Sequence, residues 1–385
     1  VDQDAVVLVG IKLQADAMRE QLSSPATFPA TTPASVRRST APMARPEANS
    51  LGVGKYVLAS RTTGTANTGV GYGALGVLTT GSNNTGVGYN ALGLNVAASN
   101  NTALGNNSLA NATSGNNTGV GFRTLTNNTS GNQNTAVGGN ALAANTTAGD
   151  NAAIGYNALA ANTTGGGGVA IGSGALAANT TGGHNTAVGL AALAANTTAN
   201  DSTAVGYVAL SLSTGANNTA VGKNALGANT TGNTNTAVGK DAGAAPVGVS
   251  GNATTTGTGH TFIGYQSGMN SATQVANVTA IGYQATAGAH FSTSIGASTS
   301  TSGQGAVAIG TDNTGAGATS TVNNEIGLGT ALHTTRIKGW LRLDQGQTTV
   351  GAAGAAAALP ATPTKYLSVK DSTGTEYVFP VYAKA

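Results

Sequence analysis

Apolar residues recur along most of the chain at a nearly constant interval. A Val, Ile or Leu followed by Gly is found every sixteen or seventeen residues between Val53 and Val238. The twelve steps are at Val53, Val70, Val87, Leu104, Val120, Val137, Ile154, Ile171, Val188, Val205, Val221 and Val238. A fixed period of this kind is typical of a solenoid or fibre, in which one short unit is repeated. The pattern therefore predicts twelve successive coils.

Beyond Asp241 the interval lengthens through the Gly-rich stretch 242–259 and then shortens. The later steps are at Ile263, Ile281, Ile295, Ile309 and Ile326. Between Ile281 and Ile309 each step is fourteen residues long. We expect smaller coils of the same kind in this part of the chain.

The residue pattern of each unit predicts two short strands and two turns. In the unit at Thr135–Val137, these three residues are expected to be extended, 138–140 to turn, Ala141–Ala143 to be extended again, and 145–149 to turn. Three-residue strands form long parallel ladders when they stack on the same strand of the next coil, about 4.8 Å away. The expected fold is all-β, a parallel β-roll or β-solenoid with coils of about 14 to 17 residues.

The apolar residue of each step and the Leu five positions later are expected to face inward. This predicted inward ladder consists of Val137, Ile154, Ile171, Val188 and Val205 with Leu142, Leu159, Leu176, Leu193 and Leu210. Burying one Val and one Leu per coil stabilises the fold by less than the conformational entropy of ordering seventeen residues costs. Lateral packing of several chains is therefore expected, most simply as a homotrimer.

The first fifty residues differ from the repeats. A short helix is predicted over 1–23, because Leu8, Ile11, Met18 and Leu22 recur at helical spacing. Gly10 is unfavourable in a helix, and the β-branched run 6–9 would suit a strand. Residues 24–45 are rich in Pro and predict an extended arm, with positive charge at Arg37 and Arg38. We expect this segment to dock on a larger partner. A solvated linker is the alternative.

The C-terminal residues also leave the repeat. Arg336–Leu343 alternates in polarity as a half-buried strand does, and 351–364 is an Ala/Pro/Gly connector. Tyr366–Lys370 and Thr375–Phe379 flank the turn residues 371–374 and predict a terminal hairpin in a small β cap. The expected domains are 1–50, an attachment segment; 51–329, the repetitive solenoid; and 330–385, the cap.

Composition supports a regular, neutral structure. The chain has 58 Gly, 4% aromatic residues and only 8% charged residues, with a net charge of +3. Such sparse charge offers no basic track for nucleic acid. No apolar run approaches the ~20 residues of a membrane-spanning helix, so no membrane insertion is expected. The absence of Cys excludes disulfides and thiolate metal sites.

Titratable residues do not form a recognisable catalytic or metal-binding pattern. His184, His260, His290 and His333 occur at unrelated phases of the repeat, so no metal site is predicted. The carboxylates are interpreted as turn residues rather than as a catalytic pair; they are Asp150, Asp201, Asp241 and Asp312. We therefore expect no catalytic residues, no metal and no cofactor, and the chain is not expected to be an enzyme.

Asn-x-Thr recurs at one position of the coil. The Asn residues are Asn145, Asn162, Asn179, Asn196 and Asn229. The motif fits N-glycosylation, but stacked Asn turns that bond their own backbone explain its periodicity better. The adjoining Thr146 and Thr147 suggest an ice-binding array as a further alternative, although the Thr ladder is broken at Val96 and Leu212.

Asn134–Leu142, with its Asn-Thr-Ala-Val-Gly-x-Asn-Ala-Leu pattern, resembles the head repeats of YadA-like trimeric autotransporter adhesins. The resemblance covers about 51–329 and implies a left-handed parallel β-roll in a trimer. The seventeen-residue form, ending in Asn-Thr-Thr-Gly, looks more like repeats of bacteriophage tail fibres. Segments 359–367 and 374–380 resemble the closing part of phage structural proteins. After Gly329 no segment matches the membrane anchor of the adhesins, which favours a virion component.

The expected function is a homotrimeric structural fibre of a virion, either a tail fibre or a capsid-attached fibre. It would be held by other virion proteins through residues 1–50 and would contact a glycan or protein of the host surface. The alternative is the head of a bacterial cell-surface adhesin, or a secreted filament subunit. An enzyme that cuts polysaccharide would need an acidic cleft, which the sequence does not place.

Overall fold

The computed structural model describes residues 49–244, 256–269, 275–310, 316–328, 365–370 and 376–381. The chain divides into two compact units, Val1–His333 and Thr334–Ala385. The described residues form strands and turns, without a helix. The expected helix, the Pro-rich arm, the strand at 336–343 and the connector at 351–364 lie outside the described residues.

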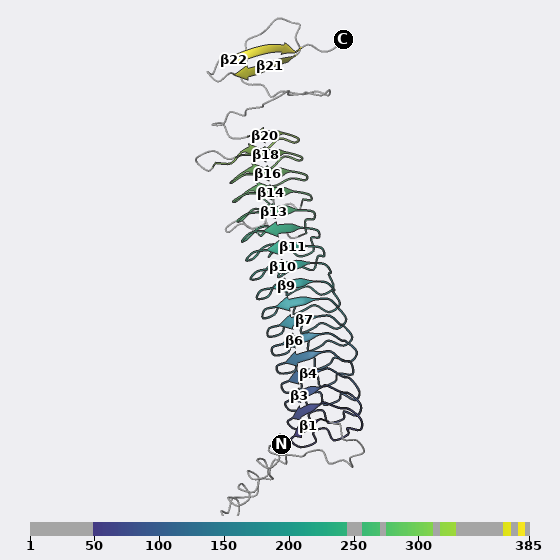
Figure 1. Ribbon diagram of the computed structural model, residues 1–385. Helices are drawn as coiled ribbons and strands as arrows, with labels where there is room; N and C mark the ends of the chain where they lie inside the picture. The colour runs from purple at the N-terminus through teal and green to yellow at the C-terminus, as the bar shows by residue number, and fades with distance from the viewer. Residues whose placement is uncertain are drawn as a thin grey trace, which may run out of the picture. The chain divides into compact units, whose positions relative to one another are not determined.

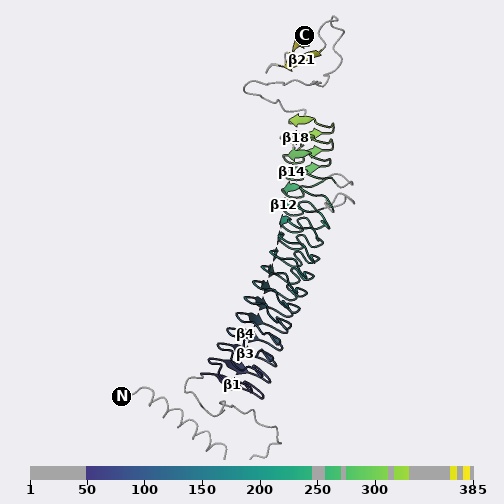
Figure 2. The same cartoon turned by 90° about the vertical axis from the view of Figure 1, so that its right-hand side faces the viewer.

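The first unit is a parallel β-solenoid, in which one coil stacks on the next (Figures 1 and 2). Seventeen three-residue strands form its long parallel sheet. They are β1 (Leu51–Val53), β2 (Thr68–Val70), β3 (Thr85–Val87), β4 (Thr102–Leu104), β5 (Thr118–Val120), β6 (Thr135–Val137), β7 (Ala152–Ile154), β8 (Val169–Ile171), β9 (Thr186–Val188), β10 (Thr203–Val205), β11 (Thr219–Val221), β12 (Thr236–Val238), β13 (Thr261–Ile263), β14 (Thr279–Ile281), β16 (Thr293–Ile295), β18 (Val307–Ile309) and β20 (Ile326–Leu328).

The register of the sheet follows the predicted steps almost throughout. Val137 pairs with Ile154, and the ladder continues across the long interval because Val238 pairs with Ile263. The last predicted step is wrong, since Leu328 rather than Ile326 pairs with Ile309. Ile326 and Leu328 are two residues apart and share one face of the strand, so the sequence pattern alone did not separate them.

The second predicted strand is absent from the seventeen-residue coils that the structure describes. The residues there make successive tight turns, in which Ala141 N–H donates to Gly138 O at 3.3 Å and Asn145 N–H to Leu142 O at 3.1 Å. Leu142 has a φ of 51° and is therefore left-handed, not extended. A second sheet forms only in the later, shorter coils, from β15 (Thr286–Ala287), β17 (Ser300–Thr301) and β19 (Thr319–Ser320).

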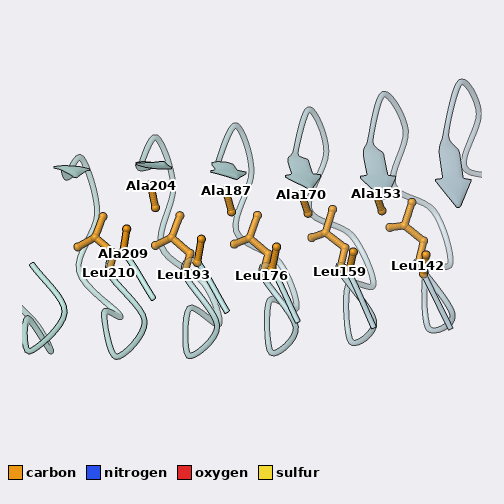
Figure 3. Packing of buried hydrophobic residues seen from close by; sticks show 14 of the residues in the cluster. Leu142, Ala153, Leu159, Ala170, Leu176, Ala187, Leu193, Ala204, Ala209 and Leu210 are labelled. Atoms are coloured by element: carbon orange, nitrogen blue, oxygen red, sulfur yellow. The ribbon is translucent and has the colours of Figure 1, made fainter. Parts of the chain in front are cut away.

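The interior of the long coils is a column of Leu and Ala (Figure 3). The Leu residues of the predicted ladder are 0–1% exposed; they are Leu142, Leu159, Leu176, Leu193 and Leu210. The middle residue of each strand points to the same interior, as the buried Ala153 and Ala170 illustrate.

The other half of the predicted inward ladder is wrong. Ile154 and Ile171 are 43% and 39% exposed, and Val137, Val188 and Val205 also lie on the outer side of their strands. The reason is the two-residue alternation of a strand. Because the central Ala faces inward, both flanking residues must face outward.

The Gly of each step is required by the close stacking of coils. Gly155 has a φ of 140°, a conformation that favours glycine, and a Cβ there would lie 2.5 Å from the carbonyl oxygen of Gly172. Gly172 occupies the same place one coil later. The Val-Gly pattern is thus explained by backbone geometry.

Buried Asn side chains connect the coils just before each strand. Asn134 N–H donates to Asn117 Oδ1 at 3.0 Å, and Asn151 N–H donates to Asn134 Oδ1 at 3.1 Å. Each amide therefore satisfies a backbone donor of the next coil, which an apolar residue would leave unpaired. At Gly168, whose N–H donates to Asn151 Oδ1, this column lacks a side chain.

The second unit contains an antiparallel pair of strands, β21 (Lys365–Lys370) and β22 (Glu376–Val381). Lys370 pairs with Glu376, as expected for the terminal hairpin predicted from the sequence.

Candidate functional site

The acidic and histidine residues of the described chain are spread along the solenoid. No group of three or more His, Cys, Asp or Glu side chains that would hold a metal ion is found in the described ranges. Asp201 Oδ1 lies 3.8 Å from Nδ1 of His184 on the neighbouring coil, and both side chains are largely exposed. Asp312 and His333 lie outside the described residues.

Asp241 has a local partner. Its carboxylate lies 2.9 Å from Lys240 Nζ and accepts a hydrogen bond from Asn224 at 3.0 Å. Partial burial alone would raise the pKa of Asp241, but the hydrogen bonds from Lys240 and Asn224 outweigh this and lower the pKa. The pair therefore has the arrangement of a charged surface contact.

His260 is a buried member of the Asn column. Its backbone N–H donates to Asn235 Oδ1 at 3.0 Å, and its Nδ1 accepts the Val278 N–H at 3.3 Å. The pKa of His260 is lowered to about 4, mainly by burial; the Val275 backbone opposes this shift, and the neighbouring His290 contributes to it. His260 is thus a neutral structural residue near neutral pH.

The Asn-x-Thr residues form a second buried column. Asn162 Nδ2 donates to Asn145 Oδ1 at 3.0 Å and to Gly165 O at 2.9 Å. All five Asn side chains are 0–1% exposed, and Thr146 Oγ1 donates to Thr163 O at 3.1 Å. This is the stacked-turn arrangement expected from the sequence. The folded coil leaves these amides inaccessible to a glycan, and the hydroxyls of Thr146, Thr163 and Thr180 donate to backbone carbonyls of the next coil.

One broad surface feature is the outer sheet face, defined by the first and third residues of the strands from β2 to β18. The first position is mostly Thr and the third is Val, Ile or Leu. Several third-position side chains are 36–48% exposed: Leu104, Ile154, Ile171, Val221, Val238, Ile263, Ile295 and Ile309. This face presents a continuous row of apolar side chains, one per coil.

A second feature is the aromatic ridge, which follows the glycine turn at the end of each strand. Its aromatic members are Tyr56, Tyr72, Tyr89, Phe122, Tyr156, Tyr207, Tyr265 and Tyr283, and its cations are Lys55, Arg123, Lys223 and Lys240. Neither surface was predicted from the sequence. The signal for the ridge is Val-Gly-Tyr, which recurs at Val70–Tyr72, Val87–Tyr89 and Val205–Tyr207.

The predicted attachment residues are not placed by the structure. Leu8, Ile11, Met18, Leu22, Arg37 and Arg38 all lie outside the described residues. Their role in docking remains a prediction.

Comparisons with models of protein families, with curated proteins and with solved structures found no match. The described part of the chain has no helix long and apolar enough to cross a membrane. What the residues establish is an all-β parallel solenoid that presents the outer sheet face and the aromatic ridge.

Proposed function

We propose that this chain is a structural, non-enzymatic fibre protein of a virion, in which three copies pack side by side and the fibre contacts the host surface. The observation that carries the proposal is the outer sheet face. An apolar side chain in the same register on successive coils is what lateral packing against equivalent chains requires, and a large exposed apolar surface marks an interaction site.

Assembly around an axis parallel to the solenoid suits this face. Cyclic symmetry keeps all chains parallel, so every copy presents the same end to an anchoring partner. The proposed anchoring segment is 1–50, because nearly interchangeable coils would look almost the same after a shift of about 4.8 Å and would not specify a unique docking position.

The head of a bacterial surface adhesin, or a secreted filament subunit, is the second candidate. The observation that favours it is the fourteen-residue repeat from Ile281 to Ile309, because coils of this length most resemble adhesin head repeats. Labelled antibodies against the solenoid would distinguish the candidates, since they would decorate virus particles in one case and uninfected cells in the other.

The assembly is tested by sedimentation of the full chain. We expect three times the chain mass of 37.1 kDa, and a stable folded monomer would contradict the proposal. Because the chain has no Cys, a single introduced thiol reports contacts between copies. We expect Ile171→Cys to form intermolecular disulfides under mild oxidation.

Leu212→Cys is the matched control, because Leu212 is 54% exposed but lies outside the strands. It should remain a free thiol within the assembly. Equal cross-linking at both positions would remove the support that the outer sheet face gives to the proposal.

A further inference from the structure

The aromatic ridge gathers residue types that are scarce elsewhere in the solenoid. In the described coils, eight of the ten Tyr and Phe residues and four of the five Lys and Arg residues belong to it. The two remaining aromatic residues are Phe262, which is buried, and Phe291, which is exposed at another turn. Such a concentration indicates a surface with a recognition role, since a neutral repeat needs neither residue type for stacking.

The ridge side chains are exposed and ordered relative to one another. Tyr72 and Tyr89 stack with ring centroids 5.4 Å apart and planes 8° apart, and Tyr265 and Tyr283 stack in the same way at 5.4 Å and 16°. Tyr89 and Tyr283 are each 53% exposed. Where two neighbouring coils both have a Tyr at this position, as in these two pairs, the aromatic surfaces are therefore stacked along the solenoid axis.

Cations are interleaved with these rings. Lys240 Nζ lies 4.7 Å from the ring centroid of Tyr265, and Lys223 Nζ lies 5.7 Å from that of Tyr207. A cation held near a ring face is attracted by the ring quadrupole and remains available to an anion from solvent. The ridge thus pairs apolar stacking surface with positive charge.

The geometry points to the aromatic ridge as a binding track for an anionic polysaccharide. The C–H faces of sugar rings stack on Tyr side chains, while carboxylate substituents pair with the interleaved Lys and Arg residues. Rings distributed over many coils along the solenoid fit an extended sugar polymer better than a single compact ligand. This inference deepens the adhesive part of the proposed function but does not require assembly of three chains.

The charge density distinguishes a polysaccharide from a nucleic acid. Only four ridge cations occur between Lys55 in the first coil and Lys240 in the twelfth, and Asp241 offsets one of them. A nucleic acid carries a phosphate at every nucleotide, and its affinity depends on neutralising many of them. The sparse charge of the ridge suits a polymer whose negative groups are fewer than its apolar sugar faces.

The test is affinity electrophoresis of the full chain in native gels that contain hyaluronan, neutral dextran or a thymidine oligonucleotide. Hyaluronan has one carboxylate for every two sugars, so we expect it to retard the wild-type chain more strongly than neutral dextran or the oligonucleotide. The double variant Tyr265→Ala/Tyr283→Ala should lose about tenfold in apparent affinity for hyaluronan. Lys223→Gln/Lys240→Gln should also weaken binding and reduce its dependence on salt.

Two variants serve as matched controls. Phe291→Ala removes an exposed aromatic ring outside the ridge, and Arg61→Gln removes a cation outside it. Both variants should bind hyaluronan as the wild type does. Circular dichroism verifies that each variant is folded, and sedimentation of the same samples reports assembly separately.

Three outcomes would overturn the assignment. The first is a wild-type chain that hyaluronan retards no more than neutral dextran does. The second is a ridge variant that is folded and binds hyaluronan with unchanged affinity. The third is a Tyr variant that loses assembly instead of binding, because the ridge would then be a contact between chains.

Discussion

The seventeen-residue coils and the fourteen-residue coils use the same first strand but complete the turn of the solenoid differently. In the long coils the return segment is a series of tight turns, and its Leu fills the interior. In the coils from β14 to β18 the return segment contains a short strand, so two sheets face each other. The comparison shows that coil length depends on how the second segment is built.

The interiors differ accordingly. Between the two sheets of the short coils lie small residues, including the buried Ala280, Ala285 and Ala287. Ser294 Oγ donates to Thr286 O at 2.6 Å, and its hydroxyl lies 3.2 Å from that of Thr301. A long coil therefore depends mainly on burial of a large apolar side chain, whereas a short coil adds a second ladder and internal hydrogen bonds.

The largest expected effect is loss of the Leu column in a long coil. Leu159→Asp places a carboxylate at a 1% exposed position between Leu142 and Leu176. Burying an unpaired charge costs several kcal/mol beyond the lost apolar contact, so we expect a destabilisation of more than about 5 kcal/mol. Thermal unfolding followed by circular dichroism measures it.

Asn157→Asp is the control in the same coil. Asn157 Oδ1 accepts a hydrogen bond from Asn140, an interaction that a carboxylate keeps. The natural pair Asn224 and Asp241 has this arrangement. We expect a change below about 1 kcal/mol. Equal melting temperatures for the two variants would contradict the assignment of inner and outer positions.

A smaller effect is expected at the glycine of the step, and it should differ between Gly155 and Gly296. A Cβ at Gly155 would lie 2.5 Å from Gly172 O, whereas at Gly296 the nearest atom is Thr299 Cγ2 at 3.1 Å. Both backbones have positive φ, so Gly296→Ala should cost about 1 to 3 kcal/mol. Gly155→Ala should cost about 3 to 5 kcal/mol because of the added clash. A reversed order in denaturant unfolding would show that the close approach of Gly172 O does not determine the cost at Gly155.

The smallest expected effect is the pH dependence at His260, which lies at the transition from long to short coils. Its pKa in the folded chain is about 4, against 6.5 in a free side chain. As pH falls, His260 is therefore protonated in the unfolded chain before it is protonated in the folded chain. The free energy of unfolding decreases between about pH 6.5 and about pH 4. At pH 5 we expect a loss of about 2 kcal/mol.

His260→Asn is the matched variant, because Asn fills the equivalent place in earlier coils, as at Asn235. Amide hydrogen exchange around β13 and β14 should vary with pH in the wild type and much less in His260→Asn. The same pH dependence in both would assign the effect to another group.

The repeat period and the strand positions were predictable because each depends on a local requirement. A parallel ladder needs the same residue types in every coil, and the left-handed turn after the strand needs Gly155 and its equivalents. The tight turns at Leu142 were not predictable in the same way, since a Leu is disfavoured at positive φ and is held there by stacking on neighbouring coils.

The direction of the Val and Ile side chains was mispredicted for a different reason. Apolar residues are expected inside, but in Thr135–Val137 the central Ala already occupies the inward position. Which residues of a three-residue strand face inward follows from the alternation of the strand, and the apolar pattern alone does not determine it. The aromatic ridge was missed because its Tyr residues occur in only some coils, so no strict period marks them.

The hydrogen bonds between coils have a mechanical consequence, because they run along the solenoid rather than across it. A pull on the two ends of the solenoid loads the coils in series, so each carries the full force. Releasing one seventeen-residue coil exchanges about 4.8 Å of stack for about 60 Å of extended chain. Such a structure yields coil by coil and absorbs work over a long extension, as a tether under sudden tension must.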